Sequence, residues 1–214
     1  LMGSAGEDRL NGSSGNDLMM GGEGDDEYVV AQAGDMINDT GTSTRDVVTS
    51  RRIDIDLNDY TGVEVVRLRG SADLNITGDA GDNRLIGNDG ENRIEGGLGL
   101  DIMTGKGGID FFVFNSTDDS TSGAVDRITD FEQGTVLAQG DMIDLLGIDA
   151  VDGGRNNAFT FVGTDAFSNT AGELRYENRG ANTYVYGDTD GDGVADLEIR
   201  IDGIFVLEDA DFVL

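Results

Sequence analysis

Acidic and amide side chains recur at every ninth residue in two stretches of the chain, 3–29 and 78–113. The seven aligned nonapeptides are GSAGEDRLN, GSSGNDLMM, GGEGDDEYV, GDAGDNRLI, GNDGENRIE, GGLGLDIMT and GKGGIDFFV. Positions one and four are always glycine, and position six is always Asp or Asn. Ca²⁺ takes roughly six to eight carboxylate and carbonyl oxygens, whereas Mg²⁺ prefers to keep its waters. The pattern therefore predicts repeated Ca²⁺ sites.

The same nine residues predict the elements that position these ligands. Six glycine-rich residues can form a turn with inward-pointing carbonyls, because glycine adopts backbone angles closed to other residues. The other three suit a short strand whose middle side chain, at position eight, faces the core. Two nonapeptides complete one coil, so turns stack at about 4.8 Å and their position-six carboxylates repel one another without a cation. The expected core residues are Leu10, Met19, Tyr28, Leu85, Ile94, Met103 and Phe112.

This pattern resembles the calcium-binding nonapeptides of RTX (repeats-in-toxin) proteins. The resemblance implies an all-β fold, a right-handed parallel β-roll solenoid with a C-terminal β-rich cap. It also implies ions between turns two nonapeptides apart, held by positions two, four and six of one turn and one, three and six of the next. The charge-free amides of Asn83 and Asn92 are expected to make weaker sites.

The ligands implied by the resemblance fall into two sets. In the first array they are Ser4, Gly6 and Asp8 with Gly21, Glu23 and Asp26, and Ser13, Gly15 and Asp17 with the turn ending at Asp35. In the second array they are Asp79, Gly81 and Asn83 with Gly96, Leu98 and Asp101, and Asn88, Gly90 and Asn92 with Gly105, Gly107 and Asp110. The same turns contain the glycines Gly22, Gly24, Gly97, Gly99 and Gly108.

We expect four segments: a first array at 1–35, a spacer at 36–77, a second array at 78–113, and a cap with a secretion-signal region at 114–214. The spacer is expected to continue the solenoid, because 47–50, 53–57 and 63–70 read as strands. Its degenerate repeat GTSTRDVVT keeps Gly41, Asp46 and Val48 at positions one, six and eight. Asp46 is expected to share an ion with Gly22, Gly24 and Asp26.

Five arginines gather in or beside the spacer strands: Arg45, Arg51, Arg52, Arg67 and Arg69. They could form a patch for an anionic polysaccharide, or they could point outward and pair with neighbouring carboxylates. The large excess of acid favours the second interpretation.

The C-terminal half resembles the C-terminal domain of serralysin-type secreted proteins through VDRITDFEQG at 125–134 and DMIDLLGID at 141–149. In that family the domain closes the roll beside the secretion signal. The final residues Asp211, Phe212, Val213 and Leu214 resemble the uncleaved tail that type I secretion machinery reads; the alternative is a last edge strand of the cap.

An acidic loop at 188–198 partly matches an EF-hand loop. Asp188, Asp190, Asp192, Gly193 and Asp196 occupy positions one, three, five, six and nine. Position twelve is Ile199, so the bidentate ligand is missing. Calcium binding and a plain acidic hairpin both remain open.

Composition narrows the function classes. The 214 residues include 43 acidic and 14 basic side chains, no cysteine and no histidine, for a net charge of −29. This composition argues against nucleic acid as a partner and excludes disulfides, histidine zinc ligands and imidazole-dependent catalysis. No apolar run reaches the roughly 18 residues of a membrane span, and no signal peptide is visible.

The leading hypothesis is the C-terminal part of a larger secreted protein that folds on Ca²⁺ binding after type I secretion. We expect roughly four to six ions, no membrane insertion and no catalysis within these residues; any catalytic activity is expected upstream. The alternatives are a polysaccharide-binding or adhesin module, and a carboxylate-type enzyme domain acting on polysaccharide.

Overall fold

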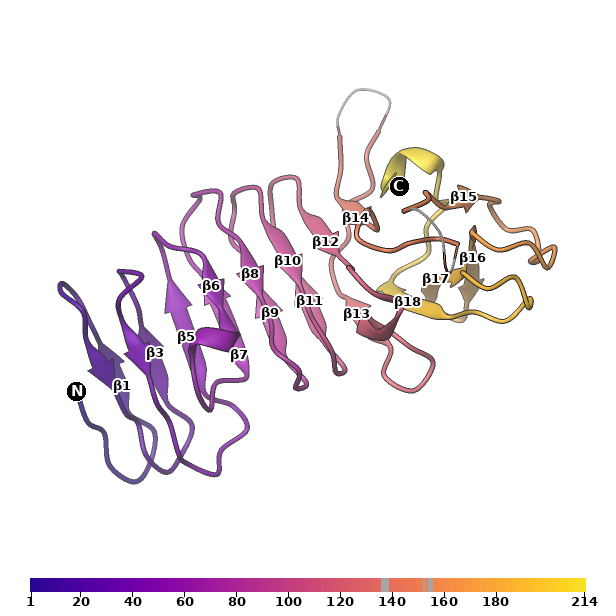
Figure 1. The fold of residues 1–214 in the computed structure, drawn as a ribbon. Helices are drawn as coiled ribbons and strands as arrows, with labels where there is room; N and C mark the ends of the chain where they lie inside the picture. Colours follow the sequence, from indigo (N-terminus) through magenta and orange to yellow (C-terminus); the bar gives the residue numbers. More distant parts are fainter. Residues whose placement is uncertain (136–138, 152, 154–155) are drawn as a thin grey trace.

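The chain forms a solenoid of short parallel strands that ends in an antiparallel cap (Figure 1). The computed structural model describes residues 1–135, 139–151, 153 and 156–214. Among these residues the helical elements are three short 3₁₀ turns, η1 (Leu57–Asp59), η2 (Thr117–Asp119) and η3 (Asp209–Asp211). The predicted all-β class is confirmed.

A long sheet of eleven strands forms one wall of the solenoid and continues into the cap. Its order is β1 (Arg9–Asn11), β3 (Glu27–Val29), β5 (Val47–Ser50), β7 (Val65–Leu68), β9 (Arg84–Ile86), β11 (Ile102–Thr104), β13 (Asp126–Ile128), β18 (Leu197–Asp202), β17 (Asn182–Asp188), β16 (Glu173–Arg179) and β15 (Thr160–Phe161). Neighbours from β1 to β18 pair in parallel, as stacked coils require.

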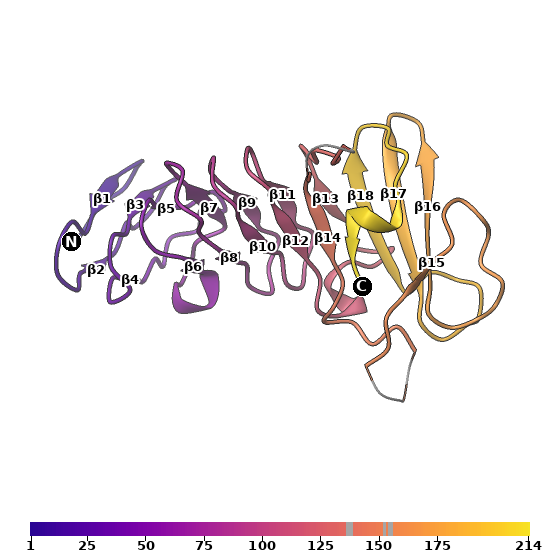
Figure 2. The same ribbon diagram turned by 90° about the horizontal axis from the view of Figure 1, so that it is seen from above.

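The opposite wall consists of two further parallel sheets (Figure 2). The short one pairs β2 (Leu18–Met19) with β4 (Met36–Ile37). The other, which we call the second sheet, has the order β19 (Phe212–Val213), β14 (Met142–Asp144), β12 (Phe111–Val113), β10 (Arg93–Glu95), β8 (Ile76–Thr77) and β6 (Ile55–Asp56). Strands β5 to β8 of the spacer lie within this same stack.

The core lies between the two walls. All seven position-eight residues are buried, and the spacer adds Val48, Ile55, Val66 and Ile76 to the same cluster. The expectation that position eight faces inward is therefore confirmed. Parallel pairing also brings each of these side chains onto its equivalent in the next coil, as with Leu10 and Tyr28.

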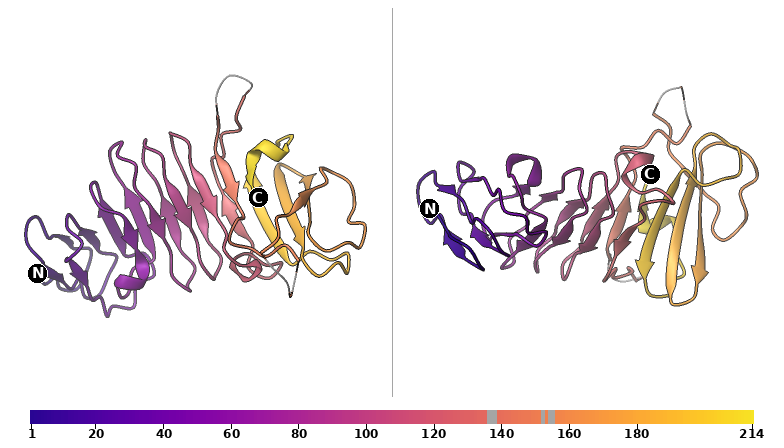
Figure 3. Two further views of the ribbon diagram at one scale, coloured as in Figure 1. Left: turned by 45° about the horizontal axis from the view of Figure 1, so that its top comes forward. Right: turned by 90° about the horizontal axis from the view of Figure 1, so that it is seen from below.

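The cap closes the end of the solenoid by extending both walls (Figure 3). Strands β16, β17 and β18 form an antiparallel meander, and β18 pairs in parallel with β13. The last strand, β19, pairs with β14, and its Phe212 is buried. The final residues thus form an edge strand of the second sheet, which is the structural alternative that the sequence left open.

Replacing Ile94 with Ala is expected to lower the free energy of unfolding by about 2–5 kcal/mol, because the cavity would lie inside a stack with no room to collapse. Urea denaturation in millimolar calcium measures the loss. Leu100→Ala is the control, since Leu100 is exposed on a turn. Equal stability of the Ile94→Ala variant and the wild type would contradict this packing.

Candidate metal sites

The turns before the strands stack in two columns, one along each side of the solenoid. In what we call the first column, the side chains at position six or its equivalent are Asp8, Asp26, Asp46, Glu64, Asn83, Asp101 and Asp126. In the second column they are Asp17, Asp35, Asn92, Asp110 and Asp141. The predicted position-six residues of both arrays therefore do lie above one another.

A hydrogen-bond ladder runs along each column in two sections, with a break between Glu64 and Asn83 in the first column and between Asp35 and Asn92 in the second. A backbone N–H at position six donates to one carboxylate oxygen of the equivalent residue in the next coil. In the first column the bonds are Asp8 to Asp26 (2.7 Å), Asp26 to Asp46 (2.7 Å), Asp46 to Glu64 (3.1 Å), Asn83 to Asp101 (2.7 Å) and Asp101 to Asp126 (2.8 Å). In the second they are Asp17 to Asp35 (3.1 Å), Asn92 to Asp110 (2.9 Å) and Asp110 to Asp141 (3.0 Å).

The other carboxylate oxygen is buried and has no protein partner at six positions of the described chain. These atoms are the Oδ2 atoms of Asp17, Asp26, Asp39, Asp101, Asp110 and Asp126. A buried polar atom without a partner costs about 1–3 kcal/mol, and more when it is charged. Such atoms are rare in folded proteins, so a row of them indicates that a cation belongs beside them. The donor set is oxygen only, which suits Ca²⁺.

Burial also raises the pKa values of five column aspartates. The pKa of Asp101 and that of Asp110 rise to about 7, and that of Asp126 to about 8, first through burial and then through nearby carboxylates. The pKa of Asp46 and that of Asp141 rise to about 6 for the same reasons. A divalent cation would reverse this effect, because it stabilises the charged form.

The invariant glycines leave room for these carboxylates and for the carbonyls of the neighbouring turn. A Cβ at Gly21, Gly96 or Gly105, all at position one, would overlap the Oδ2 atom of the aspartate five residues later. At positions two and four, Cβ atoms on Gly22, Gly24, Gly97, Gly99 and Gly108 would overlap the carbonyls of Ser4, Gly6, Asp79, Gly81 and Gly90, respectively. The structure therefore brings together the predicted carbonyl and carboxylate ligands of facing turns.

The surroundings of three predicted ligands, Glu23, Leu98 and Gly107, differ from those of the ligands above. The carbonyl of Glu23 already accepts the Gly6 N–H at 2.6 Å. The Leu98 side chain is exposed on its turn. Gly107 has open space beside it, and its N–H donates to the Asn88 carbonyl at 3.3 Å.

The turn pair 12–17 and 30–35 differs from the aligned repeats in its hydrogen bonds. No neighbouring atom lies within 4 Å of a Cβ built on Gly15, and Ser13 binds Asn11 through its N–H. Both oxygens of Asp35 accept N–H groups, Oδ1 from Asp17 and Oδ2 from Ala31. The structure brings Asp17 and Asp35 together, but it leaves only Asp17 with an unpaired oxygen.

Three buried carboxylates meet where the first array joins the spacer. Asp26, Asp39 and Asp46 present oxygens that all lie within 4.8 Å of one another. Asp39 accepts the Gly22 N–H at 3.0 Å through Oδ1, and its Oδ2 has no partner. Gly41 packs against the carbonyl of Gly22. Asp39 was missed from the sequence because it lies two residues before the degenerate repeat, outside the nine-residue frame.

Two further carboxylates that sequence reasoning missed extend the columns into the cap. Asp126 and Asp141 belong to the VDRITDF and DMIDL motifs, and they receive the N–H groups of Asp101 and Asp110. Each precedes a buried isoleucine by two residues, as position six precedes position eight in the nonapeptides. That spacing was the available signal.

Comparison with known families agrees with this geometry. Residues 75–214 match the family described as peptidase M10 serralysin C terminal. Residues 1–28 match the family described as "RTX calcium-binding nonapeptide repeat (4 copies)". The chain belongs to the serralysin C-terminal family. No curated protein matches it closely enough to be counted.

The serralysin-type domain and the RTX repeats identify a calcium-binding module of the kind found in secreted proteins, and neither of them is the catalytic part of such proteins. In the described residues, no helix is long and apolar enough to cross a membrane.

At one interface between two turns of this RTX module, side chains of the protein itself donate hydrogen bonds to the carbonyl oxygens. Between turns 70–75 and 87–92, the side-chain amides of Asn88 and Asn92 donate to the carbonyls of Ala72 (2.9 Å) and Leu74 (2.8 Å). The Lys106 ammonium donates to the Gly87 carbonyl at 2.6 Å, and burial lowers its pKa. These groups take the place that a cation would have between two turns.

The amide of Asn83 is also engaged within its own turn. Its Oδ1 accepts the Asp79 N–H at 2.8 Å, and its Nδ2 donates to Asp79 Oδ1 at 3.0 Å. Among the position-six residues, the two asparagines thus close turns by hydrogen bonding, whereas most of the aspartates keep an unpaired oxygen.

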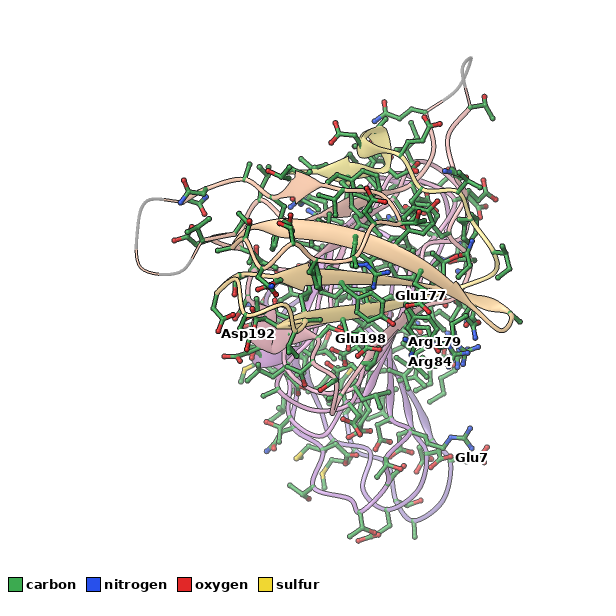
Figure 4. All side chains as sticks on the ribbon, turned by 90° about the vertical axis from the view of Figure 1, so that its right-hand side faces the viewer. Glu7, Arg84, Glu177, Arg179, Asp192 and Glu198 are labelled. Atoms are coloured by element: carbon green, nitrogen blue, oxygen red, sulfur yellow. The ribbon has the colours of Figure 1, made fainter. Side chains whose placement is uncertain are left out.

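The acidic loop of the serralysin-type cap gathers Asp188, Asp190 and Asp196 within 4.8 Å. Asp192 lies outside this group, is exposed, and accepts the Val194 N–H (Figure 4). Both oxygens of Asp188 accept backbone N–H groups, from Gly191 at 2.7 Å and Gly193 at 2.9 Å. Backbone N–H groups of the loop thus satisfy both oxygens of Asp188, whereas several column aspartates have one unpaired oxygen.

In calcium-free buffer, lowering the pH from about 8 to about 5 is expected to increase β structure. Burial raises the pKa values of Asp46, Asp101, Asp110 and Asp126 from 3.8 to between about 6 and about 8. In that window the ion-free fold binds more protons than the unfolded chain, so its stability rises as the pH falls and is lost as the pH rises. Circular dichroism against pH measures this, and a signal that weakens on acidification would contradict it.

Proposed function

We propose that this module folds when calcium ions settle between its stacked turns, after type I secretion has exported the chain unfolded. The observation that carries the proposal is the row of buried, unpaired carboxylate oxygens along both columns. Neutralising them and stacking the coils are one process, because each carboxylate faces the next coil. The residues with most to gain are those with a buried, unpaired Oδ2 atom: Asp17, Asp26, Asp39, Asp101, Asp110 and Asp126.

The energy of calcium binding is comparable with the stability of a domain. Extracellular calcium modules bind each ion with Kd values of about 10⁻⁴–10⁻³ M, so millimolar calcium contributes about 1 kcal/mol per ion. Roughly four to six ions would supply about 4–6 kcal/mol, which is similar to the whole stability of many domains. In micromolar calcium this contribution vanishes, and the net charge of −29 favours an expanded chain.

The position of the C-terminal tail supports export before folding. In the folded cap, Asp211 accepts hydrogen bonds from the Gln133 side chain and the Glu208 N–H, both at 2.8 Å. Phe212 is buried, and β19 pairs with β14. A transporter that reads these residues can reach them only while the cap is unfolded. We assign no catalytic role to this chain, which has no histidine and no cysteine.

Replacing Asp39 with Asn is expected to move the calcium midpoint of folding several-fold higher, because the variant keeps the shape of the side chain but removes one of three clustered charges. Calcium titration followed by circular dichroism measures the midpoint. Asp59→Asn is the matched control, since it removes one exposed acid of the spacer. Identical midpoints for the two variants would contradict a role for Asp39 in holding an ion.

Chelating calcium from the wild-type chain is expected to abolish most of its β signal and to increase its hydrodynamic radius. Circular dichroism and size-exclusion chromatography in EGTA, followed by addition of calcium, measure both changes. Magnesium at the same concentration serves as the control and is expected to restore little structure. A strong β signal at full stability in excess EGTA would overturn the proposed function.

A further inference from the structure

Half of the chain's basic residues gather on one part of the surface. Two adjoining hollows of about 360 and 730 Å³ lie on the outer face of the long sheet, over β1 to β9, and share Arg9 and Glu27 in their walls. Their walls contain seven of the 14 basic residues: Arg9, Arg45, Arg51, Arg52, Arg67, Arg69 and Arg84. We call this surface the arginine face.

The arginine face runs along the axis of the solenoid. Cross-strand register places Arg9, Glu27, Val47, Val65 and Arg84 in one outward row over five successive coils. The coils repeat at about 4.8 Å, so the row is long and narrow. The end-on view has Glu7 and Arg84 on the same side of the molecule, although they come from distant coils (Figure 4).

Few of these arginines have an ionic partner. Within the described residues, only Arg9 (2.9 Å) and Arg69 (3.7 Å) form ion pairs, and both pair with Glu27. The expectation that the spacer arginines pair with neighbouring carboxylates therefore holds for Arg69 and fails for the other four. Acid does lie beside this face, because Glu7, Asp8, Asp25, Asp26 and Glu27 line the hollows, but within the described residues four of the spacer arginines form no ion pair with it.

The cap half of the same sheet shows the opposite arrangement. Arg127 and Arg200 both pair with Asp202, and Arg175 and Arg179 both pair with Glu177. Arg179 also lies over the ring of Tyr184, at 5.2 Å from its centroid. Each of these four cap arginines thus has an ionic partner, whereas within the described residues five of the seven arginines of the arginine face have none.

We propose that the arginine face binds a linear anionic polysaccharide carrying carboxylate or sulfate groups. Arginine offers a planar fork that matches such oxyanions in bidentate fashion. The half-buried side chains of Val29, Val47 and Val65 lie among the arginines and provide an apolar floor for the C–H faces of sugar rings. Repetition over successive coils suits a polymer better than a small anion.

Two other anionic partners fit this face less well. Glu7, Asp8, Asp25, Asp26 and Glu27 line the hollows together with the arginines, so a wide polyanion such as duplex nucleic acid would meet these carboxylates too, on a protein of net charge −29. An anionic membrane would meet that same net repulsion, and the arginines lie in hollows rather than on a protruding apolar ridge. A single extended glycan chain is narrow enough to follow the row.

The test is affinity electrophoresis and calorimetry of the full chain in millimolar calcium at low ionic strength. The probes are heparin, which carries sulfates and carboxylates, hyaluronan, which carries carboxylates alone, and neutral dextran. Binding to either anionic glycan but not to dextran, with affinity that falls steeply with added salt, is expected. Failure of both anionic glycans to bind, or binding only to phosphatidylglycerol vesicles, would overturn the proposal.

The variants compare three arginines that flank β5 with three that lie in β16 and β18 of the same long sheet. Arg45→Ser/Arg51→Ser/Arg52→Ser removes three exposed charges without ion pairs and is expected to weaken glycan binding about tenfold or more, which is about 1.4 kcal/mol. Arg175→Ser/Arg179→Ser/Arg200→Ser makes the same charge change at the cap and is expected to stay within about twofold of the wild type. Equal losses in the two triples would overturn the proposal. Calcium titration by circular dichroism verifies that each variant folds.

Discussion

Like-charge repulsion between carboxylates stacked in register is the constraint on which this structure depends. Parallel coils place equivalent residues about 4.8 Å apart, so an aspartate at position six always faces another acid or an amide. Most aspartates of the ladder use one oxygen for a backbone N–H, as Asp26 does for Asp8. The second oxygen has no protein donor at most of these positions. The glycines at position one follow from this constraint, because the carboxylates fill the space that a Cβ would need.

The cap extends the two carboxylate columns by one coil and then terminates them. Asp126 and Asp141 carry the two columns one coil beyond the second array. Asp126 then gives its own N–H to the Ser120 hydroxyl at 2.8 Å, a neutral partner that needs no further ion. Strands β18 and β19 cover the last parallel strands of the two walls. A solenoid with an open end would expose its strand edges and its core. The cap that terminates the carboxylate columns therefore also closes the solenoid.

The nine-residue period was enough to predict the strands, the buried position-eight residues and the register of the carboxylates, because all three depend on local spacing. The period could not predict the roles of Asp39 and Lys106. Each of these side chains hydrogen-bonds to a turn 17 to 19 residues away, and neither is a residue that the nonapeptide pattern specifies. The nine-residue period also could not predict the arginine face. Arg9 and Arg84 share one row only because β3 and the spacer strands β5 and β7 stack in register between them.

The geometry of the repeat also explains how one chain can carry two surfaces of opposite charge. Position six lies in the turn and must provide oxygen, and position eight must be apolar, whereas positions seven and nine point outward from the strand. Arg9, Glu27, Arg84 and Ile102 all occupy position seven of the long sheet, so its chemistry varies freely from coil to coil. Arginines can therefore accumulate there without disturbing either the core or the carboxylate columns. Calcium at the columns would lower the negative charge behind that face, so cation binding and an attraction for polyanions reinforce each other.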